Sequence, residues 1–97
     1  MEKTFAFYSD PSHGWAKVPV KLLVNIGIAD KVSSYSYYRN GFAYLEEVRD
    51  LHLLLARLKT MDVDVKFKDL HSNRSSAIRN YKSFNTFSYK GGSNAKM

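Results

Sequence analysis

The strongest local signal in the chain is the stretch Ser33-Ser34-Tyr35-Ser36-Tyr37-Tyr38-Arg39-Asn40-Gly41-Phe42-Ala43-Tyr44-Leu45. The dipeptide Asn40-Gly41 supplies the two residues with positive φ that a tight hairpin turn requires. Aromatic residues, which favour strands, flank it on both sides. The stretch therefore predicts a β-hairpin with its turn at Asn40 and Gly41.

Upstream of the hairpin, the sequence predicts one strand and one helix. Residues 4–8 are rich in aromatic side chains and run into the polar segment 9–14, which is typical of a strand that ends in a turn. Residues 15–18 allow a short extended return. Residues 19–27 predict a helix of about two turns that starts at a proline and ends at a glycine. Its apolar face is formed by Leu22, Leu23 and Ile26.

Downstream of the hairpin, the sequence predicts a longer helix, a strand and a short final helix. Asp50 is placed to cap the longer helix, whose apolar stripe is formed by Leu51, Leu54, Leu55 and Leu58. Residues 63–67 alternate between apolar and charged side chains, which indicates a half-buried strand. Ser72 or Ser75 caps the final helix, which contains Ala77, Ile78 and Tyr81.

The order of these elements predicts the fold class. Strand, helix, strand, strand, helix and strand make the βαββαβ, or ferredoxin-like, arrangement, an α+β fold in the form of a two-layer α/β sandwich. A short C-terminal helix follows. Residues 1–83 are expected to form a single compact domain, and residues 84–97 a frayed tail. The first and third strands are then central neighbours in the sheet.

Charge is distributed unevenly along the 97 residues. The chain holds 15 Lys and Arg against 9 Asp and Glu, a net charge of +6. Residues 1–64 are neutral, so the whole excess lies in residues 65–97, where Asp69 is the single acid. Such a segment attracts phosphate backbones, anionic lipid or an acidic protein face. No stretch is apolar for long enough to span a bilayer, so we expect a soluble chain without a Sec-type signal and no membrane partner.

The basic segment is the best candidate for a phosphate site. Arg74, Ser75, Ser76 and Arg79 would surround a phosphate if one of the two serines starts the final helix. The alternative is a solvated polar turn with an ordinary serine cap. Together with the strand residues on the same outward face, the predicted nucleic-acid contacts are Lys66, Lys68, Arg74, Ser75, Arg79, Tyr81, Lys82, Tyr35 and Tyr37.

Aromatic residues on the predicted strands allow a second interpretation of the binding surface. Tyr35, Tyr37 and Tyr81 are candidates for stacking with bases, as in sheet-based RNA readers. The alternative is that the aromatic side chains pack beneath the helices. The signature of the common RNA-recognition module is absent.

The sequence gives little support to catalysis. Ser9, Asp10, Ser12 and His13 occur close together, but without the spacing of a nucleophile elbow. Asp10 and Ser12 are expected to satisfy backbone groups of a turn, with Trp15 anchoring the loop on the core. The chain has no cysteine, and the histidines lack metal-ligand spacing. Glu46 and Glu47 read as solvated charges. We therefore expect no enzyme, no metal and no cofactor.

One resemblance covers about residues 5–84. The runs FYSDPSHGW (7–15), LL…IGIADK (22–31), SYSY (34–37) and YLEE (44–47) resemble small uncharacterised proteins carried by bacterial phages, plasmids and other mobile elements. The resemblance implies a cytoplasmic bacterial setting and a non-enzymatic accessory role. Such a role is either binding nucleic acid or blocking a host protein, including a defence nuclease.

Two functional hypotheses follow. The first is a small binding protein whose basic C-terminal region contacts the phosphates of DNA or RNA. The second is a protein-interaction module encoded by a mobile element, acting on a host defence protein or forming a homodimer through the open sheet face or a strand edge.

Overall fold

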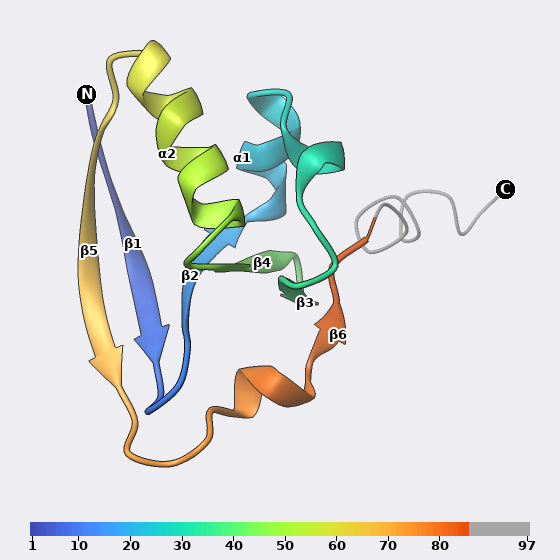
Figure 1. The fold of residues 1–97 in the computed structure, drawn as a ribbon. Coiled ribbons are helices and arrows are strands. Elements are labelled where there is room, and N and C mark those ends of the chain that lie inside the picture. Colours follow the sequence, from blue (N-terminus) through green and yellow to red (C-terminus); the bar gives the residue numbers. More distant parts are fainter. Residues whose placement is uncertain (86–97) are drawn as a thin grey trace, which may run out of the picture.

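The computed structural model describes residues 1–85, which form one six-stranded sheet with two α-helices and two short 3₁₀ helices (Figure 1). Along the chain the elements are β1 (Glu2–Ser9), β2 (Gly14–Pro19), α1 (Val20–Asn25), η1 (Ala29–Lys31), β3 (Tyr37–Arg39), β4 (Phe42–Glu46), α2 (Asp50–Thr60), β5 (Asp64–His71), η2 (Ala77–Asn80) and β6 (Lys82–Ser83). The predicted tail, residues 84–97, lies outside the described residues from 86 onward.

The strands lie in the spatial order β5-β1-β2-β4-β3-β6. Neighbouring strands are antiparallel except β1 and β5, which pair in parallel from Glu2↔Asp64 to Ser9↔His71. A parallel pair needs a long crossover connection, and the chain between β1 and β5 contains both α-helices. Because β1 pairs with β2 on its other side, it lies inside the sheet, whereas β5 forms one edge.

The helix face of the sheet is the side covered by α1 and α2 (Figure 1). Alternate strand residues, Phe5, Ala16, Val18, Ala43 and Leu45, are buried there against helix residues Leu23, Leu51, Leu54 and Leu58. Full burial of one such leucine contributes about 1.5–3 kcal/mol. This cluster is the main core, and Phe84 is buried in it as well.

The opposite side, the outer face, carries a second, smaller core. Trp15 and Tyr44 are buried there under Ile78, a residue of η2. The segment that brings Ile78 to this face, residues 72–81, connects β5 with β6 at opposite edges of the sheet (Figure 1). We call it the crossover segment. It covers the end of the outer face where Tyr8, Tyr37 and Tyr81 pack against Trp15 and Tyr44.

The predicted hairpin is confirmed. Strands β3 and β4 are antiparallel, with Arg39 opposite Phe42. Asn40 and Gly41 have φ values of 51° and 85°, the left-handed conformation that a two-residue turn of this type requires. The short final helix is present as the 3₁₀ helix η2, but its cap is Ser76 rather than Ser72 or Ser75, because the Ser76 hydroxyl accepts a hydrogen bond from the Ile78 N–H.

The ferredoxin-like prediction is wrong. The sheet has six strands rather than four, and β2 lies between the two strands predicted to be central neighbours, residues 4–8 and 42–45. The reason is the turn at residues 10–13, where the Asp10 N–H donates to the His13 carbonyl at 2.9 Å. This turn sends the chain straight back along β1, so the segment allowed only as a short return becomes an interior strand.

Two acidic residues near the start of α2 have structural roles that differ from the prediction. Asp50 is the first residue of the helix rather than its cap, and its buried carboxylate accepts hydrogen bonds from the hydroxyls of Ser33 and Ser36. Glu46 is not simply solvated, since its carboxylate accepts from the N–H groups of residues 48, 49 and 50. Together they hold the loop before β3 against the start of α2.

Candidate functional site

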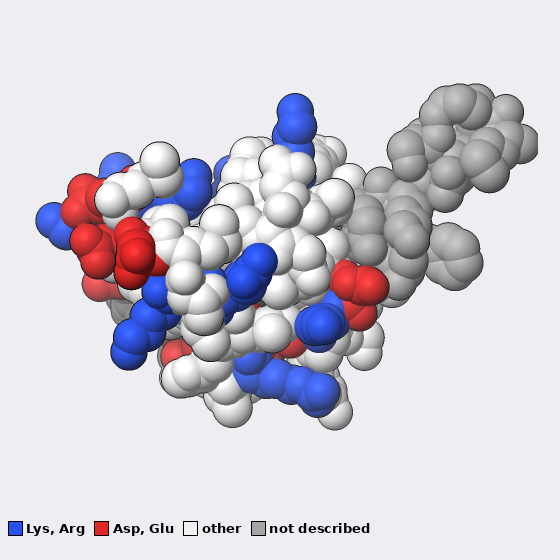
Figure 2. Space-filling model, turned by 90° about the horizontal axis from the view of Figure 1, so that it is seen from above, with Lys and Arg blue, Asp and Glu red and all other residues white. Residues whose placement is uncertain are grey.

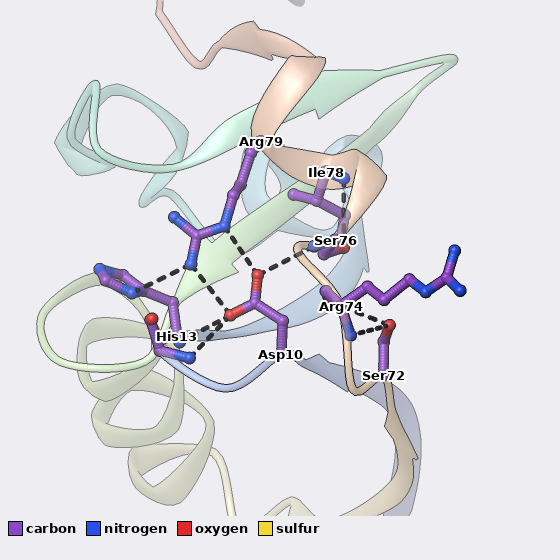
Figure 3. A network of polar contacts seen from close by, with 8 residues as sticks. Asp10, His13, Ser72, Arg74, Ser76, Ile78 and Arg79 are labelled. Carbon is purple, nitrogen blue, oxygen red and sulfur yellow. Dashed lines mark hydrogen bonds and ion pairs between the residues drawn. The ribbon is translucent and has the colours of Figure 1, made fainter.

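The predicted phosphate cradle contains a carboxylate of the protein itself. The Asp10 side chain, which has no exposed surface, lies between the β1–β2 turn and the crossover segment (Figure 3). Arg79 donates to it twice, from Nε to Oδ2 at 2.7 Å and from Nη2 to Oδ1 at 2.9 Å. The Ser76 N–H donates to Oδ2 at 2.9 Å. The arginine and the backbone N–H expected to hold an external phosphate therefore hold Asp10.

The same carboxylate also organises the turn in which it lies. The N–H groups of Ser12 and His13 donate to Asp10 Oδ1 at 3.0 and 2.9 Å. This confirms the turn role predicted for Asp10, whereas Ser12 takes part through its backbone N–H. Hydrogen bonding from Arg79, followed by that from the Ser76 N–H, holds the pKa of Asp10 far below its usual range, although burial acts in the opposite direction. The hydrogen bond with Asp10 likewise raises the pKa of Arg79. Both groups are therefore charged at neutral pH.

The predicted aromatic residues are divided between packing and exposure. Tyr37 lies edge-on to Trp15, with ring centroids 6.2 Å apart, and Tyr81 lies edge-on to Tyr44 at 5.1 Å. Burial, followed by the neighbouring Tyr81 and Tyr8, raises the pKa of Tyr44. Tyr35 lies in the loop before β3 and is 72% exposed. The three tyrosines predicted to stack with bases do not form one platform.

Lys66 and Lys68 are brought together on the outer face, and a lysine that the sequence analysis did not select joins them. Lys68 of β5 and Lys17 of β2 both pair with Ala6 of β1, one on each side. Paired residues in a sheet project to the same face, so these two lysines flank a small side chain about 10 Å apart in backbone position. We call Lys17, Lys66 and Lys68 the lysine row.

The members of the lysine row differ in their contacts. The Lys66 ammonium lies 3.2 Å from the Glu2 carboxylate in an exposed ion pair. Such a pair contributes little free energy in water. Lys17 and Lys68 form no ion pair with a described residue. The Lys17 ammonium lies 4.3 Å from the centre of the Phe42 ring, so a cation and an aromatic side chain are adjacent on this face.

The remaining predicted cations do not join the lysine row. Arg74 and Ser75 are exposed in the loop that leads to η2. Lys82 lies in β6, at the edge of the sheet opposite to β5, and pairs with Tyr38 of β3. It lines an open pocket there together with Tyr81 and Arg39. Lys90 and Lys96 lie outside the described residues. The basic residues of the last third that the structure describes therefore do not converge on one patch.

Figure 2 shows the molecule of Figure 1 as seen from above. Lysine and arginine side chains are spread over this side with acidic side chains among them. A continuous basic surface is therefore not found on the side in view.

Lys17 and Arg39 are the cations that sequence reasoning missed. Lys17 lies on the same face of β2 as Trp15, opposite to Ala16. Residues 15–18 were predicted only as a short extended return, so the outward side chain of Lys17 had no predicted neighbours. Arg39 directly precedes the turn residues Asn40 and Gly41, and the guanidinium lies 4.9 Å from the centre of the Tyr81 ring. Its proximity to Tyr81 depends on the pairing of β3 with the very short β6.

Within the described part of the chain, no helix combines the length and apolar character needed to cross a membrane. No set of three His, Asp or Glu side chains among the same residues is placed to hold a metal ion. Comparison with protein-family models, with curated proteins and with solved structures finds no match to the chain. The resemblance to proteins of mobile elements therefore stays a prediction.

Proposed function

We propose that the protein binds nucleic acid through the outer face of its sheet, with the lysine row contacting phosphates. The observation that carries this proposal is the register that places Lys17 and Lys68 on either side of Ala6, on one face and without an acidic partner among the described residues. Two cations held on one face by the strands on either side of β1 suit a repeating anionic backbone, because phosphate contacts supply most of the sequence-independent affinity.

Aromatic side chains beside the lysine row support the same proposal. Phe42 is half-buried under the Lys17 ammonium, and Tyr81 is half-buried next to Arg39. Bases of a single strand stack on such rings, and the stacking is tolerant of sequence. The affinity is therefore expected to depend strongly on salt and only weakly on base sequence.

The proposal replaces the C-terminal basic region with the sheet face as the binding surface. Arg79 and Ser76 have no part in it, since Arg79 and the Ser76 N–H hold Asp10. The alternative of a protein-interaction module acting through a strand edge gains no specific support. The edge strand β5 carries Lys66, Lys68 and Asp69, and charged residues of this kind discourage edge-to-edge pairing.

The test is fluorescence anisotropy with labelled single-stranded and double-stranded DNA and RNA over a salt series. Lys17→Gln with Lys68→Gln is compared with Lys21→Gln with Lys31→Gln, a pair of exposed lysines on α1 and η1 that changes the net charge equally. Loss of two phosphate contacts lowers the slope of log K against log salt by about 1.4 for single strands and about 1.8 for B-DNA.

The control pair is expected to leave this slope nearly unchanged. An equal decrease of the slope in both double variants would mean that net charge rather than the lysine row drives binding. Absence of binding by the unaltered protein at low salt would remove the proposal for all four nucleic acids.

A further inference from the structure

A continuous path of cationic and aromatic side chains crosses the outer face of the sheet. It starts at Lys68 on β5, and strand pairing leads from there through Ala6 of β1 to Lys17 of β2. The Lys17 ammonium lies over the Phe42 ring of β4 at 4.3 Å, and Phe42 pairs in turn with Arg39 of β3. The crossover segment covers the other end of this face (Figure 1).

The path ends at Tyr81, the last residue of the crossover segment. The Arg39 guanidinium lies 4.9 Å from the centre of the Tyr81 ring. From β5 to β3 the path crosses four strand spacings, a length of about 19 Å. Two of its residues are exposed and the others half-buried, so each reaches the surface. We call this set the outer path: Lys68, Ala6, Lys17, Phe42, Arg39 and Tyr81.

The charge of the outer path is entirely positive. Its cations, Lys68, Lys17 and Arg39, form no ion pair with a described residue. They come from β5, β2 and β3, so Ala6 of β1 separates the first two and Phe42 of β4 the last two. Cations separated by small or aromatic side chains suit a polymer in which charged phosphates alternate with flat bases.

The two cation–ring contacts are weak enough for a base to replace them. Lys17 lies over Phe42 and Arg39 lies over Tyr81. At an exposed site such a contact is weaker than the stacking of a base on an aromatic ring. A long cationic side chain displaced from its ring turns to the phosphate beside the base. The ring and the cation then each gain a partner from the same strand.

A duplex does not permit the same exchange. Its bases are paired and stacked inside the helix, so it presents phosphates and groove edges to a flat protein face. Lys17 and Arg39 would leave their rings for phosphates with no base to take their place. The duplex therefore gains the phosphate contacts alone, whereas a single strand gains stacking on Phe42 and Tyr81 as well.

We infer that the outer path binds single-stranded DNA or RNA in preference to a duplex, with the nucleic acid running across the strands of the sheet. Bases stack on Phe42 and Tyr81, and phosphates lie at Lys68, Lys17 and Arg39. The inference rests on the proposed function, to which it adds the preferred class of nucleic acid and its course over the face.

The first test compares three labelled ligands of about 16 nucleotides per strand, the upper site size of one OB fold. They are a thymidine strand, an abasic strand with the same phosphates, and the duplex of the thymidine strand with its complement. Anisotropy is measured at about 150 mM salt, where exposed charges are screened. The thymidine strand is expected to bind at least roughly fivefold more tightly than either of the others, the factor for one stacked base. Equal affinities for the thymidine and abasic strands, or tighter binding of the duplex, overturn the inference.

The second test removes the rings and keeps the charge. Phe42→Leu with Tyr81→Leu is expected to weaken binding of the thymidine strand by at least roughly fivefold and to leave binding of the duplex and the abasic strand no weaker. The matched control is Phe67→Leu with Tyr35→Leu, two exposed rings outside the outer path. Equal losses from both double variants, or equal losses for the thymidine strand and the duplex, contradict the role of the rings.

A third measurement needs no substitution. Ultraviolet light crosslinks 5-iodouracil in a strand to an aromatic side chain that lies against it, and trypsin then releases the labelled peptide. Crosslinks are expected in residues 40–49, which contain Phe42, and in residues 80–82, which contain Tyr81. Crosslinks confined to residues 32–39, which contain Tyr35 and Tyr37, contradict the course given to the strand.

The proposed function and this inference fail in different measurements. If Lys17→Gln with Lys68→Gln changes the salt slope no more than its control pair does, the proposed function fails and the inference fails with it. If the lysine pair acts as expected but the thymidine and abasic strands bind equally, the proposed function stands and the inference alone is overturned.

Discussion

The Asp10 carboxylate and the Arg79 guanidinium meet across 69 residues of sequence through two hydrogen bonds of 2.7 and 2.9 Å. Figure 3 shows the pair between the β1–β2 turn and the crossover segment. The Arg79 guanidinium also lies 5.4 Å from the centre of the Trp15 ring. The pair therefore fastens the crossover segment to the outer face of the sheet, and with it the residues that follow, Asn80 to Lys82.

Substitution of Asp10 by Asn is expected to destabilise the protein and to change how its stability depends on pH. The folded-state pKa of Asp10 is depressed, so its contribution to the free energy of unfolding is present above the pKa of an unfolded aspartate, about 3.9, and is lost as the pH falls below it. Urea unfolding at pH 7 and at pH 3 measures this. The difference in the free energy of unfolding between the unaltered protein and the variant is large at pH 7 and smaller at pH 3.

Arg79→Gln is the companion variant for this prediction. It leaves a buried carboxylate without its cation, so the pKa of Asp10 rises and the variant loses stability at neutral pH. Because Asp10 and Arg79 contact each other, the double variant is expected to lose less than the two single losses combined. Additive losses would show that the two residues stabilise the fold independently.

Ser36→Ala tests the hydrogen bonds that link the Ser36 hydroxyl to Asp50 and Glu46. The Ser36 hydroxyl is fully buried, donates to the Asp50 carboxylate and accepts from the Glu46 N–H at 3.0 Å. Its removal leaves both partners short of a hydrogen bond, which costs about 1–3 kcal/mol of unfolding free energy. Ser34→Ala, at an exposed position two residues earlier, is the control and stays within about 0.5 kcal/mol. Similar urea midpoints for the two variants would contradict the role given to Ser36.

Local turn chemistry explains which parts of the fold could be predicted from the sequence. The hairpin depends on two adjacent residues, Asn40 and Gly41, whose backbone preference is enough to set the turn. Strand β2 could not be recognised in the same way. Trp15 and Ala16 are both buried, one under the crossover segment and the other under the helices. With both faces covered, the segment lacks the alternation of apolar and polar residues that reveals a strand.

The contacts of the candidate sites could not be predicted because their partners lie far apart in the sequence. Arg79 looks like a phosphate ligand in its own segment, and only the turn 69 residues away shows that Asp10 occupies its guanidinium. Arg39 and Tyr81 are separated in the sequence by β4, α2 and β5, and they meet because β3 pairs with β6, a strand of two residues. Such a strand leaves no periodic pattern in a sequence.

Leu54→Ala and Leu55→Ala separate the core side of α2 from its margin. The helical stripe predicted from leucine spacing includes both residues, but Leu54 is fully buried and Leu55 only half-buried. Loss of the Leu54 side chain leaves a cavity and is expected to cost about 2–5 kcal/mol, whereas Leu55→Ala costs less because water reaches the site. Thermal unfolding of the two variants gives the comparison. A larger loss from Leu55→Ala would place the apolar face of α2 differently.

Substitutions in the hairpin turn test how much the backbone conformation of Asn40 and Gly41 contributes to stability. Gly41 has a φ of 85°, and an alanine held in the left-handed region costs about 1–2 kcal/mol. Gly41→Ala is therefore expected to lower the free energy of unfolding by about this amount. Asn40→Gly keeps a residue that accepts the φ of 51° at this position, so the turn survives and the free energy of unfolding is expected to stay nearly unchanged. Urea unfolding of the two variants measures the difference, and equal losses would show that the positive φ of Gly41 does not set the stability of the turn.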